Sequence, residues 1–395
     1  MVMRKVRHHS IHSRMIARRG FLATTMALPV VCLAQCADDQ TIEDVAEKVD
    51  AGLHEGMERW KVPSASYAIF GCNKVRIARA HGVARGGIKR APDIRTLYQA
   101  ASISKTVTAV TALRLVQEGR LKLDEDVSVR LKSWKLPPGP QDSSAPVTLR
   151  RLFGMTAGVN VHGFPGYAAD TKQPTLVEIL NGMKPIVNTE PIRVVKRPGG
   201  QQEYSGGGYE IAELVMQDVT GEKLASLAKR SVFDPLQMRD SYFAHPLPHH
   251  VQGQAADGHN SAGVPLSGRW HNYPEGAAAG LWTTPTDLAR IALAVSESWQ
   301  RGGFLEQKIA QEMMTHVDGF GYGIGGAVGG AGDDIVFNKG GDNAGYHCSL
   351  IFFPRTGQGM AIMTNGDQGP RLFDRANQAA SAGLHWPPFP RIMGG

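Results

Sequence analysis

Hydrophobic positions near the start of the chain follow a helical period. Between Thr41 and Trp60 they recur every three or four residues, at Ile42, Val45, Val49, Leu53 and Met57. This spacing puts them on one face and predicts an amphipathic α-helix. Two short apolar runs follow over Ser64–Phe70 and Val75–Ala80, and the residues between them, Gly71 to Lys74, suit a turn. The two runs predict a pair of adjacent strands.

The middle of the chain has a different pattern, in which short helical segments alternate with polar loops from about residue 121 to 280. Capping boxes, N-terminal prolines and glycine stops mark the helix ends. These signals predict helices from near Ser102 to Gln117, after Thr175 and Glu178, over Tyr209–Val219, and after Thr284–Asp287. The final apolar runs predict strands over Asp334–Asn338, Tyr346–Phe353 and Gly359–Thr364, with a turn at Pro354–Gly357.

Strands at both ends of the chain can share one antiparallel sheet if the helical middle leaves the sheet and returns to it. The predicted fold class is therefore α/β (α+β), with an antiparallel sheet flanked by helices and a mainly helical subdomain. We expect one domain over residues 41–385. Its α/β part would comprise residues 41–120 and 285–385, and its helical part residues 121–284. The cleft between the two parts is the natural place for a ligand.

The positive charge of the chain is concentrated at its N-terminus. The 395 residues carry a formal net charge of +7, and residues 1–34 contain six Lys and Arg residues and no acidic residue. The rest of the chain has no basic stripe with interleaved aromatic residues, which argues against a nucleic-acid partner. No segment has the roughly 20 uninterrupted apolar residues that a transmembrane helix needs.

The same segment resembles an export signal. Arg18-Arg19-Gly20-Phe21-Leu22 is similar to a twin-arginine motif, and the apolar run that follows to Ala34 is too short to span a bilayer. We therefore expect residues 1–34 to be a signal peptide and the protein to be periplasmic or secreted. A lipid anchor at Cys36 is the alternative, although Gln35 stands where a small residue is expected. The four cysteines include no CxxC pair and no zinc-type spacing with histidine.

Ser102-Ile103-Ser104-Lys105 is the first candidate for chemistry. Residues three apart lie on one face of a helix, so the Lys105 amine can reach the Ser102 hydroxyl. Burial and the positive end of the helix both disfavour a charged amine, and a neutral amine can take the serine proton. Ser226 and Lys229 have the same spacing, which we interpret as surface and core positions of an ordinary helix. Ser102 differs because an apolar helix continues from it.

A nucleophile at the start of such a helix resembles the penicillin-recognising serine hydrolases: class C β-lactamases, D-Ala-D-Ala carboxypeptidases and family VIII esterases. Tyr204-Ser205-Gly206 resembles the family's Tyr-x-Asn element, which lies in a loop before a helix. The resemblance implies that Tyr204 transfers protons. The family's Asn binds the carbonyl of a substrate amide, so Gly206 in its place implies weaker binding of acylamino β-lactams.

Lys339-Gly340-Gly341-Asp342 resembles the family's Lys-Thr-Gly on the edge strand beside the nucleophile. By this resemblance, Gly341 keeps the strand open for substrate, and the N–H of Asp342 joins that of Ser102 as an oxyanion hole. Lys339 would offer a cation to a substrate carboxylate. The three elements occur in the family's order, and the similarity extends over about residues 41–385.

The sequence thus predicts a serine hydrolase in which Ser102, helped by Lys105 and Tyr204, attacks an ester, β-lactam or D-amino-acid peptide carbonyl. The expected partner is a small-molecule or peptidoglycan-like substrate, and no metal or organic cofactor is implied. No Gly-x-Ser-x-Gly elbow or His-Glu-x-x-His motif offers a competing chemistry. The alternative is a non-hydrolytic penicillin-binding or cell-wall-fragment-sensing protein of the same fold, for which Gly206 is the best support.

Overall fold

The computed structural model describes residues 37–387, so the predicted signal peptide and Cys36 lie outside the described residues. The helices are α1 Asp39–Trp60, α2 Ser104–Gln117, α3 Leu149–Phe153, α4 Leu176–Asn181, α5 Gly207–Thr220, α6 Leu224–Ala228, α7 Gly276–Ala279, α8 Pro285–Arg301, α9 Gln307–Met313 and α10 Pro370–Leu384. The strands are β1 Ser64–Gly71, β2 Lys74–Gly82, β3 Tyr98–Gln99, β4 Tyr167–Ala168, β5 Tyr242–Phe243, β6 His271–Asn272, β7 Leu281–Thr283, β8 Ala327–Gly329, β9 Val336–Asn343, β10 Tyr346–Phe353 and β11 Gln358–Thr364. Within residues 37–387, no helix combines the length and the apolar character needed to cross a membrane.

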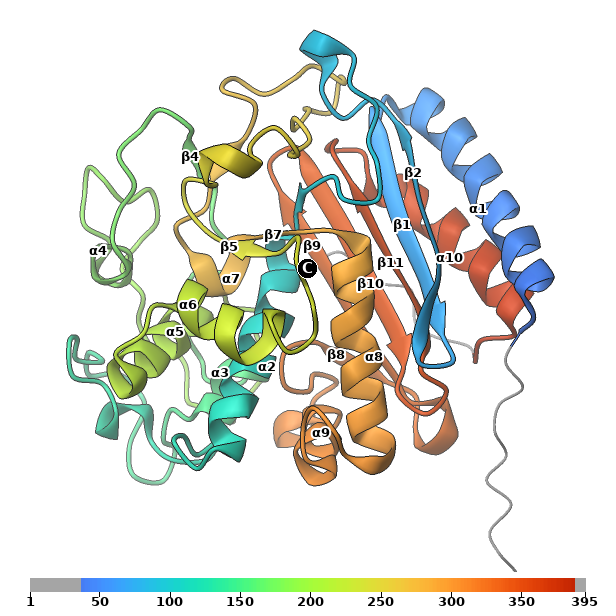
Figure 1. Ribbon diagram of the computed structural model, residues 1–395. Helices are drawn as coiled ribbons and strands as arrows, with labels where there is room; N and C mark the ends of the chain where they lie inside the picture. The colour runs from blue at the N-terminus through green and yellow to red at the C-terminus, as the bar shows by residue number, and fades with distance from the viewer. Residues whose placement is uncertain (1–36, 388–395) are drawn as a thin grey trace, which may run out of the picture. The chain divides into compact units, whose positions relative to one another are not determined.

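A six-stranded antiparallel sheet forms the centre of the α/β part, in the order β2-β1-β11-β10-β9-β8. β1 comes from the start of the chain and β11 from its end, and they pair with Ala65 opposite Thr364 (Figure 1). The prediction that strands from both ends share one antiparallel sheet is therefore confirmed.

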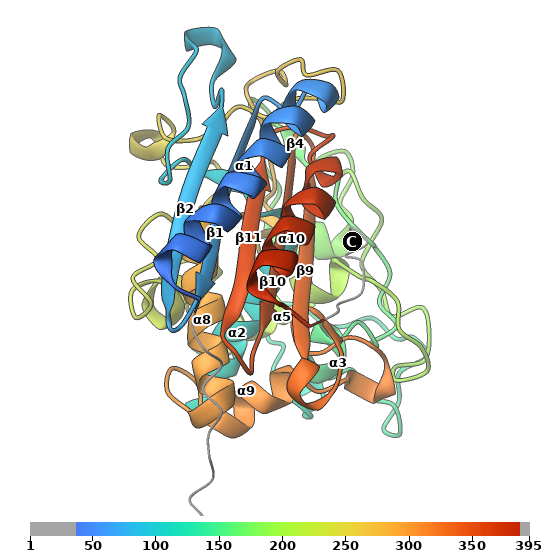
Figure 2. The same ribbon diagram turned by 90° about the vertical axis from the view of Figure 1, so that its right-hand side faces the viewer.

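Helices cover both faces of this sheet. α1 and α10 lie side by side over one face, and α8 packs on the other (Figures 1 and 2). Alternate residues of β1 point into different cores, because Tyr67 and Ile69 pack under α1 and α10 whereas Phe70 points to the opposite side. Full burial of one such large apolar side chain stabilises the fold by roughly 1.5–3 kcal/mol. Burial on both faces explains why the strands are nearly continuous apolar runs.

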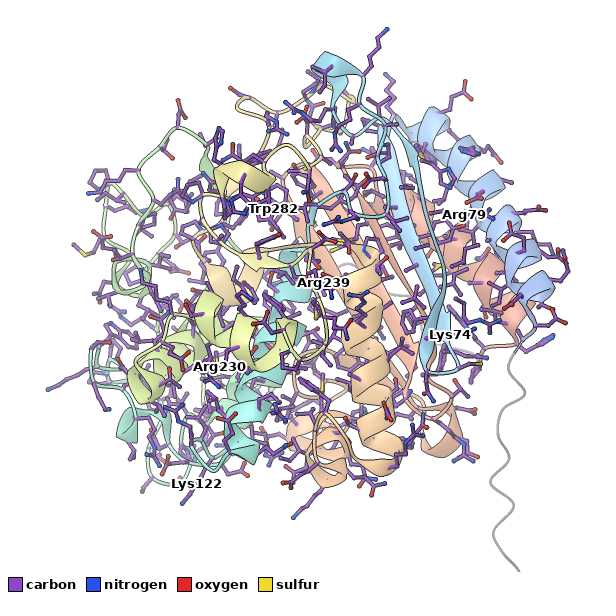
Figure 3. All side chains as sticks on the ribbon, viewed as in Figure 1. Lys74, Arg79, Lys122, Arg230, Arg239 and Trp282 are labelled. Atoms are coloured by element: carbon purple, nitrogen blue, oxygen red, sulfur yellow. The ribbon has the colours of Figure 1, made fainter. Side chains whose placement is uncertain are left out.

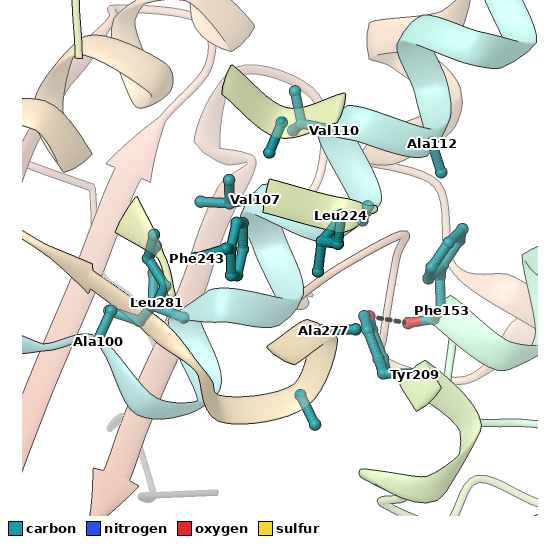
Figure 4. Close-up of a cluster of buried hydrophobic side chains, with 14 of the residues drawn as sticks. Ala100, Val107, Val110, Ala112, Phe153, Tyr209, Leu224, Phe243, Ala277 and Leu281 are labelled. Atoms are coloured by element: carbon teal, nitrogen blue, oxygen red, sulfur yellow. Dashed lines mark hydrogen bonds between the residues drawn. The ribbon is translucent and has the colours of Figure 1, made fainter. Parts of the chain in front are cut away.

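The helix that follows the candidate nucleophile is buried on all sides. Between Ser104 and Leu115, α2 has a single residue that is not buried. Figure 4 shows Val107 and Val110 of this helix packed among side chains from other elements, including Phe243 and Leu224. A lysine in the first turn of α2 is therefore forced into the interior of the protein.

An aromatic cluster connects the helical part to the sheet. Trp282 of β7, labelled in Figure 3, is fully buried. The centre of its ring lies 5.0 Å from that of Trp270 and 5.6 Å from that of Tyr346 on β10. The Tyr346 hydroxyl donates a hydrogen bond of 2.7 Å to the carbonyl of Ala256. This cluster fixes β7 against the sheet, and β7 in turn supports the segment that carries Ser102.

Most of the predicted elements are confirmed, including the capping box at Thr175 and Glu178 and the helix that Thr284 caps. The predicted strand Asp334–Asn338 is wrong at both ends, because β9 begins at Val336 and continues to Asn343. Its glycines look like a loop in the sequence, but the neighbouring strand β10 holds them extended. The short strand β8 and the helix α10 were not predicted.

Candidate active site

Ser102 lies in a 3-10 turn, Ala101–Ile103, that leads directly into α2. The turn is anchored on both sides of Ala100. The N–H of Ala100 donates to the carbonyl of Leu281 in β7 at 2.8 Å, and the Cys348 thiol donates to the carbonyl of Ala100 at 2.9 Å. Ala101 has a φ of +46°, a left-handed conformation that costs a non-glycine residue of the order of 1–3 kcal/mol. The surrounding packing therefore holds the backbone next to Ser102, the candidate nucleophile, in a strained arrangement.

The contact between this turn and β9 requires glycine at position 341. A Cβ atom on Gly341 would lie 2.3 Å from the carbonyl oxygen of Ala100 and 2.5 Å from Sγ of Cys348. The sequence-based reason for this glycine, that a side chain would block the substrate, stays a prediction, and the structure adds a second reason. The missing side chain makes room for the turn that carries Ser102.

Three of the predicted residues meet at the Ser102 hydroxyl. The Tyr204 hydroxyl donates to Ser102 Oγ at 2.8 Å, and Lys105 Nζ donates to the same oxygen at 3.1 Å. Lys105 also donates to the carbonyl of Ala278 at 2.9 Å. Tyr204 reaches the site from the loop before α5. One hydroxyl is thus in contact with two groups that can carry its proton.

Burial and neighbouring charges shift the pKa values of both groups. Burial is the main influence on Lys105 and lowers the pKa of its ammonium group. Burial alone would raise the pKa of Tyr204. The charges of Lys105 and Lys339, with the hydrogen bond to Ser102, outweigh that effect and lower the pKa of Tyr204 to about 7. Each of the two ammonium groups lies 5.0 Å from the centre of the Tyr204 ring. A phenol that ionises near neutral pH is suited to take a proton from serine.

Lys339 to Asp342 lie inside β9, beyond the strand end at Asn338 that the apolar run predicted. β8 pairs with only the first three residues of β9, so the edge of the strand is open from Lys339 onward. Lys339 is buried, and its ammonium group donates to the carbonyl of Gly340 at 2.8 Å. In the register of the β9–β10 hairpin, Gly340 and Asp342 turn their N–H and C=O groups away from β10 and toward the open edge. The Asp342 side chain lies near His347, with 3.5 Å between carboxylate and imidazole.

A pocket opens in front of Ser102 and Tyr204. Its other walls come from loop 162–165, from Tyr273, and from residues 342–344 at the end of β9. The Tyr273 hydroxyl connects two of these walls, because it accepts from the N–H of Ala344 at 2.9 Å and donates to the carbonyl of Pro165 at 3.4 Å. A substrate can therefore approach Ser102 between the loop and the open strand edge.

The family model for Beta-lactamase matches residues 49–384, which is most of the chain. The chain belongs to the Beta-lactamase family. This family comprises serine hydrolases, and the sequence-based resemblance and fold class are both confirmed.

Curated relatives of this β-lactamase-family chain include Protein flp of Staphylococcus aureus (strain N315), which is 26% identical over 258 residues. That alignment covers 65% of this chain and 48% of the relative, so the chain spans about half the length of the Staphylococcus aureus protein. Esterase EstB of Burkholderia gladioli is 25% identical over 303 residues, covering 70% of this chain and 76% of EstB.

Solved structures share the fold. The octameric penicillin-binding protein homologue from Pyrococcus abyssi has a TM-score of 0.71 at 23% identity, covering 86% of this chain and 78% of that structure. The D-amino acid amidase from Ochrobactrum anthropi SV3, complexed with L-phenylalanine amide, has a TM-score of 0.69 at 21% identity, covering 86% of this chain and 99% of the amidase.

Loop 162–165 of this β-lactamase-family chain contributes aromatic side chains to the pocket, which the sequence analysis did not predict. In the structure, His162 lines the pocket with its ring centre 4.8 Å from that of Tyr204, whereas Tyr167 is buried outside the pocket. Phe164 also lines the pocket. The signal that could have found it is Gly206, since a missing side chain leaves space that another residue must fill.

Three buried carboxyl groups behind Lys105 were not predicted either. Glu210 and Glu213 of α5 accept hydrogen bonds from the N–H groups of Ala278 and Ala277, at 3.1 and 2.9 Å. Burial raises the pKa of Glu210 well above its ordinary value, and it raises that of Glu213 to about 7 and that of Glu275 to about 8. No group of His, Cys, Asp and Glu side chains within residues 37–387 is arranged to hold a metal ion. We interpret Glu210 and Glu213 as supports for α7.

Proposed function

We propose that this chain is an exported serine hydrolase that forms an acyl-enzyme on Ser102 from an ester, β-lactam or D-amino-acid peptide. The observation that carries the proposal is the position of Ser102 Oγ, 2.8 Å from Tyr204 Oη and 3.1 Å from Lys105 Nζ, at the pocket. We assign the reaction to one domain over residues 41–385. Residues 41–120 and 285–385 would supply Ser102, Lys105 and Lys339, and the helical part, 121–284, would supply Tyr204.

In the first half-reaction, Ser102 Oγ attacks the carbonyl carbon and its proton passes to Tyr204, whose lowered pKa suits that transfer. The N–H groups of Ser102 and Asp342 hold the carbonyl oxygen as it becomes negative. When the tetrahedral intermediate collapses, the bond to the leaving alcohol or amine breaks and the leaving group takes the proton from Tyr204. In the second half-reaction, water attacks the acyl carbon, gives its proton to Tyr204, and Ser102 recovers a proton as the acid leaves.

Lys105 and Lys339 have separate roles in this proposal. Lys105 holds Ser102 Oγ and stabilises the charge on Tyr204, because its ammonium group lies over the Tyr204 ring. Lys339 carries the second buried cation beside the open edge of β9, where it would attract a carboxylate on the substrate. The names of two relatives, an esterase and a D-amino acid amidase, support the substrate range.

The second candidate is a protein of this fold that binds penicillin or cell-wall fragments without turnover, and Gly206 favours it. Labelling with a fluorophosphonate and with a fluorescent penicillin separates the two candidates. A hydrolase is labelled on Ser102 and releases product in excess of enzyme. A binding protein retains a stoichiometric adduct and shows no multiple turnover of any ester, lactam or D-peptide. Absence of any label on Ser102 would reject the acyl-enzyme.

Export is proposed from the twin-arginine-like segment within residues 1–34. N-terminal sequencing of protein from the native host tests it. A mature protein that begins after Ala34 supports a cleaved signal peptide, and one that begins with lipid-modified Cys36 supports the anchored alternative. A cytoplasmic protein that retains Arg18 and Arg19 would contradict export.

A further inference from the structure

We propose that Phe164 determines the acyl-group specificity of this site and that the subsite it forms takes an apolar acyl group rather than an amide-bearing one. The inference rests on the proposed acyl transfer at Ser102. It goes beyond that proposal because it names which part of the substrate the enzyme distinguishes and which side chain does so.

The Phe164 ring occupies the space that a side chain at position 206 would need. A Cβ atom on Gly206 would lie 2.7 Å from Cε2 of Phe164 and 3.2 Å from the carbonyl oxygen of His162. Gly206 has φ −70° and ψ −36°, a conformation open to every amino acid. Contact with the ring, and not backbone strain, is therefore what restricts this position to glycine.

The loop that carries Phe164 is held in place from two sides. Gly206 and Gly207 donate their N–H groups to the carbonyls of His162 and Val161, each at 3.0 Å. On the other side, the Tyr273 hydroxyl donates to the carbonyl of Pro165 at 3.4 Å. Val161 has a φ of +61°, which is rare for a β-branched residue and persists only where surrounding contacts impose it. Phe164 is thus a positioned wall of the pocket.

Among the described residues that line the pocket, Asn343 is the one with a side-chain amide that could replace the missing asparagine at position 206. Asn343 lines the pocket, but its amide nitrogen already donates to Gln99 Oε1 at 2.8 Å and to the carbonyl of Ala279 at 3.2 Å. Both of its N–H groups are therefore used. A substrate amide placed beside Phe164 would lose its hydrogen bonds to water without replacement, whereas an alkyl or aryl group would be stabilised by contact with the ring.

The test compares three p-nitrophenyl esters that share a leaving group: acetate, butyrate and N-acetylglycinate. Wild-type enzyme should have a higher kcat/KM for butyrate than for N-acetylglycinate. Phe164→Ala should lower kcat/KM for butyrate by about tenfold and change acetate by less than about threefold, because only the longer chain reaches the ring. Phe164→Leu is the matched control and should retain most of the preference.

The double variant Phe164→Ala/Gly206→Asn should raise kcat/KM for N-acetylglycinate about threefold to tenfold over Phe164→Ala, because it supplies an amide donor in cleared space. Gly206→Asn alone should not, because its Cβ meets the Phe164 ring. Ratios between substrates do not depend on the folded fraction of a variant. If Phe164→Ala turned over all three esters with the same kcat/KM ratios as wild type, the inference about Phe164 would be overturned and the proposed function would stand. No turnover and no label on Ser102 would overturn the proposed function and this inference together.

Discussion

Glu210 and Lys105 are connected through a single residue, Ala278. The N–H of Ala278 donates to the Glu210 carboxyl group at 3.1 Å, and its carbonyl accepts from Lys105 at 2.9 Å. Both side chains are buried, so losing either bond would leave a polar group without bulk water as a partner. Glu210 therefore positions the segment that holds the lysine, although it does not touch Ser102.

This connection predicts a difference between two variants of Glu210. Glu210→Gln keeps an oxygen acceptor for Ala278, so we expect kcat/KM for an ester within about threefold of wild type. Glu210→Ala leaves a buried N–H unpaired and frees α7, which should lower kcat/KM about tenfold. Steady-state kinetics at several pH values check this, with thermal unfolding to correct for folded protein. Equal activity of the two variants would contradict a positioning role.

The lowered pKa of Tyr204 predicts the pH dependence of hydrolysis. If Tyr204 must be ionised to take the serine proton, kcat/KM for an ester should rise with pH through about 7 and then level off. Tyr204→Phe should reduce the rate about 100-fold to 10,000-fold and remove this rise. Lys339→Met removes one of the cations that lower the pKa, so the rise should move to higher pH. A profile that stays in place in Lys339→Met would argue against Tyr204 as the titrating group.

The two Ser-x-x-Lys elements of the chain provide a matched pair. Ser102→Ala should abolish ester hydrolysis with little change in stability, since only the nucleophile is lost. Ser226→Ala should leave activity unchanged, because Ser226 is exposed on α6 and Lys229 forms an ion pair with Asp234 instead. Mass spectrometry after acylation should find the adduct on Ser102. An adduct on Ser226 would refute the assignment.

Glu275 predicts a loss of stability as pH rises. Burial raises its pKa from 4.5 to about 8, so the folded protein holds a proton that the unfolded chain releases. Because the pKa of Glu275 is higher in the folded than in the unfolded protein, the free energy of unfolding falls as the pH rises from about 4.5 to 8. Glu275→Gln should therefore be more stable than wild type at pH 8, by roughly 4 kcal/mol, and similar to it at pH 4.5. Denaturant unfolding at both pH values measures this. Glu58→Gln, on the exposed side of α1, is the control and should show no such difference.

Local signals predicted much of the fold. The helix caps at Thr175 and Thr284 depend on hydrogen bonds within four residues, so the sequence alone indicates them. The extent of β9 depends instead on pairing with β10, which overrides the loop character of its glycines. β8 is a three-residue strand in a glycine-rich segment and carries too short a pattern to be recognised.

The candidate site shows the same division. Ser102 and Lys105 are three residues apart on one helical turn, and the sequence predicts their contact directly. Tyr204 could be assigned to the site only through its family motif, since it is 102 residues from Ser102 in the chain. Gly206 signals a missing side chain in the sequence, but it does not indicate that Phe164 fills the space, and nothing in the sequence indicates Glu210, because the contacts with Gly206 and Ala278 arise from long-range packing.

The pairing of β1 with β11 has a consequence for when this enzyme becomes active. Ala65 finds its partner, Thr364, only after almost the entire chain has been synthesised. The turn that carries Ser102 rests on Gly341 and Cys348, which also come late. Bringing β1 and β11 together closes a very long loop, which is slow because the chain loses entropy before the stabilising contacts between the strands form. A nascent chain would therefore contain Ser102 without the strained turn at Ala101 and remain inactive until the last strands are in place. A chain truncated before these strands would remain inactive.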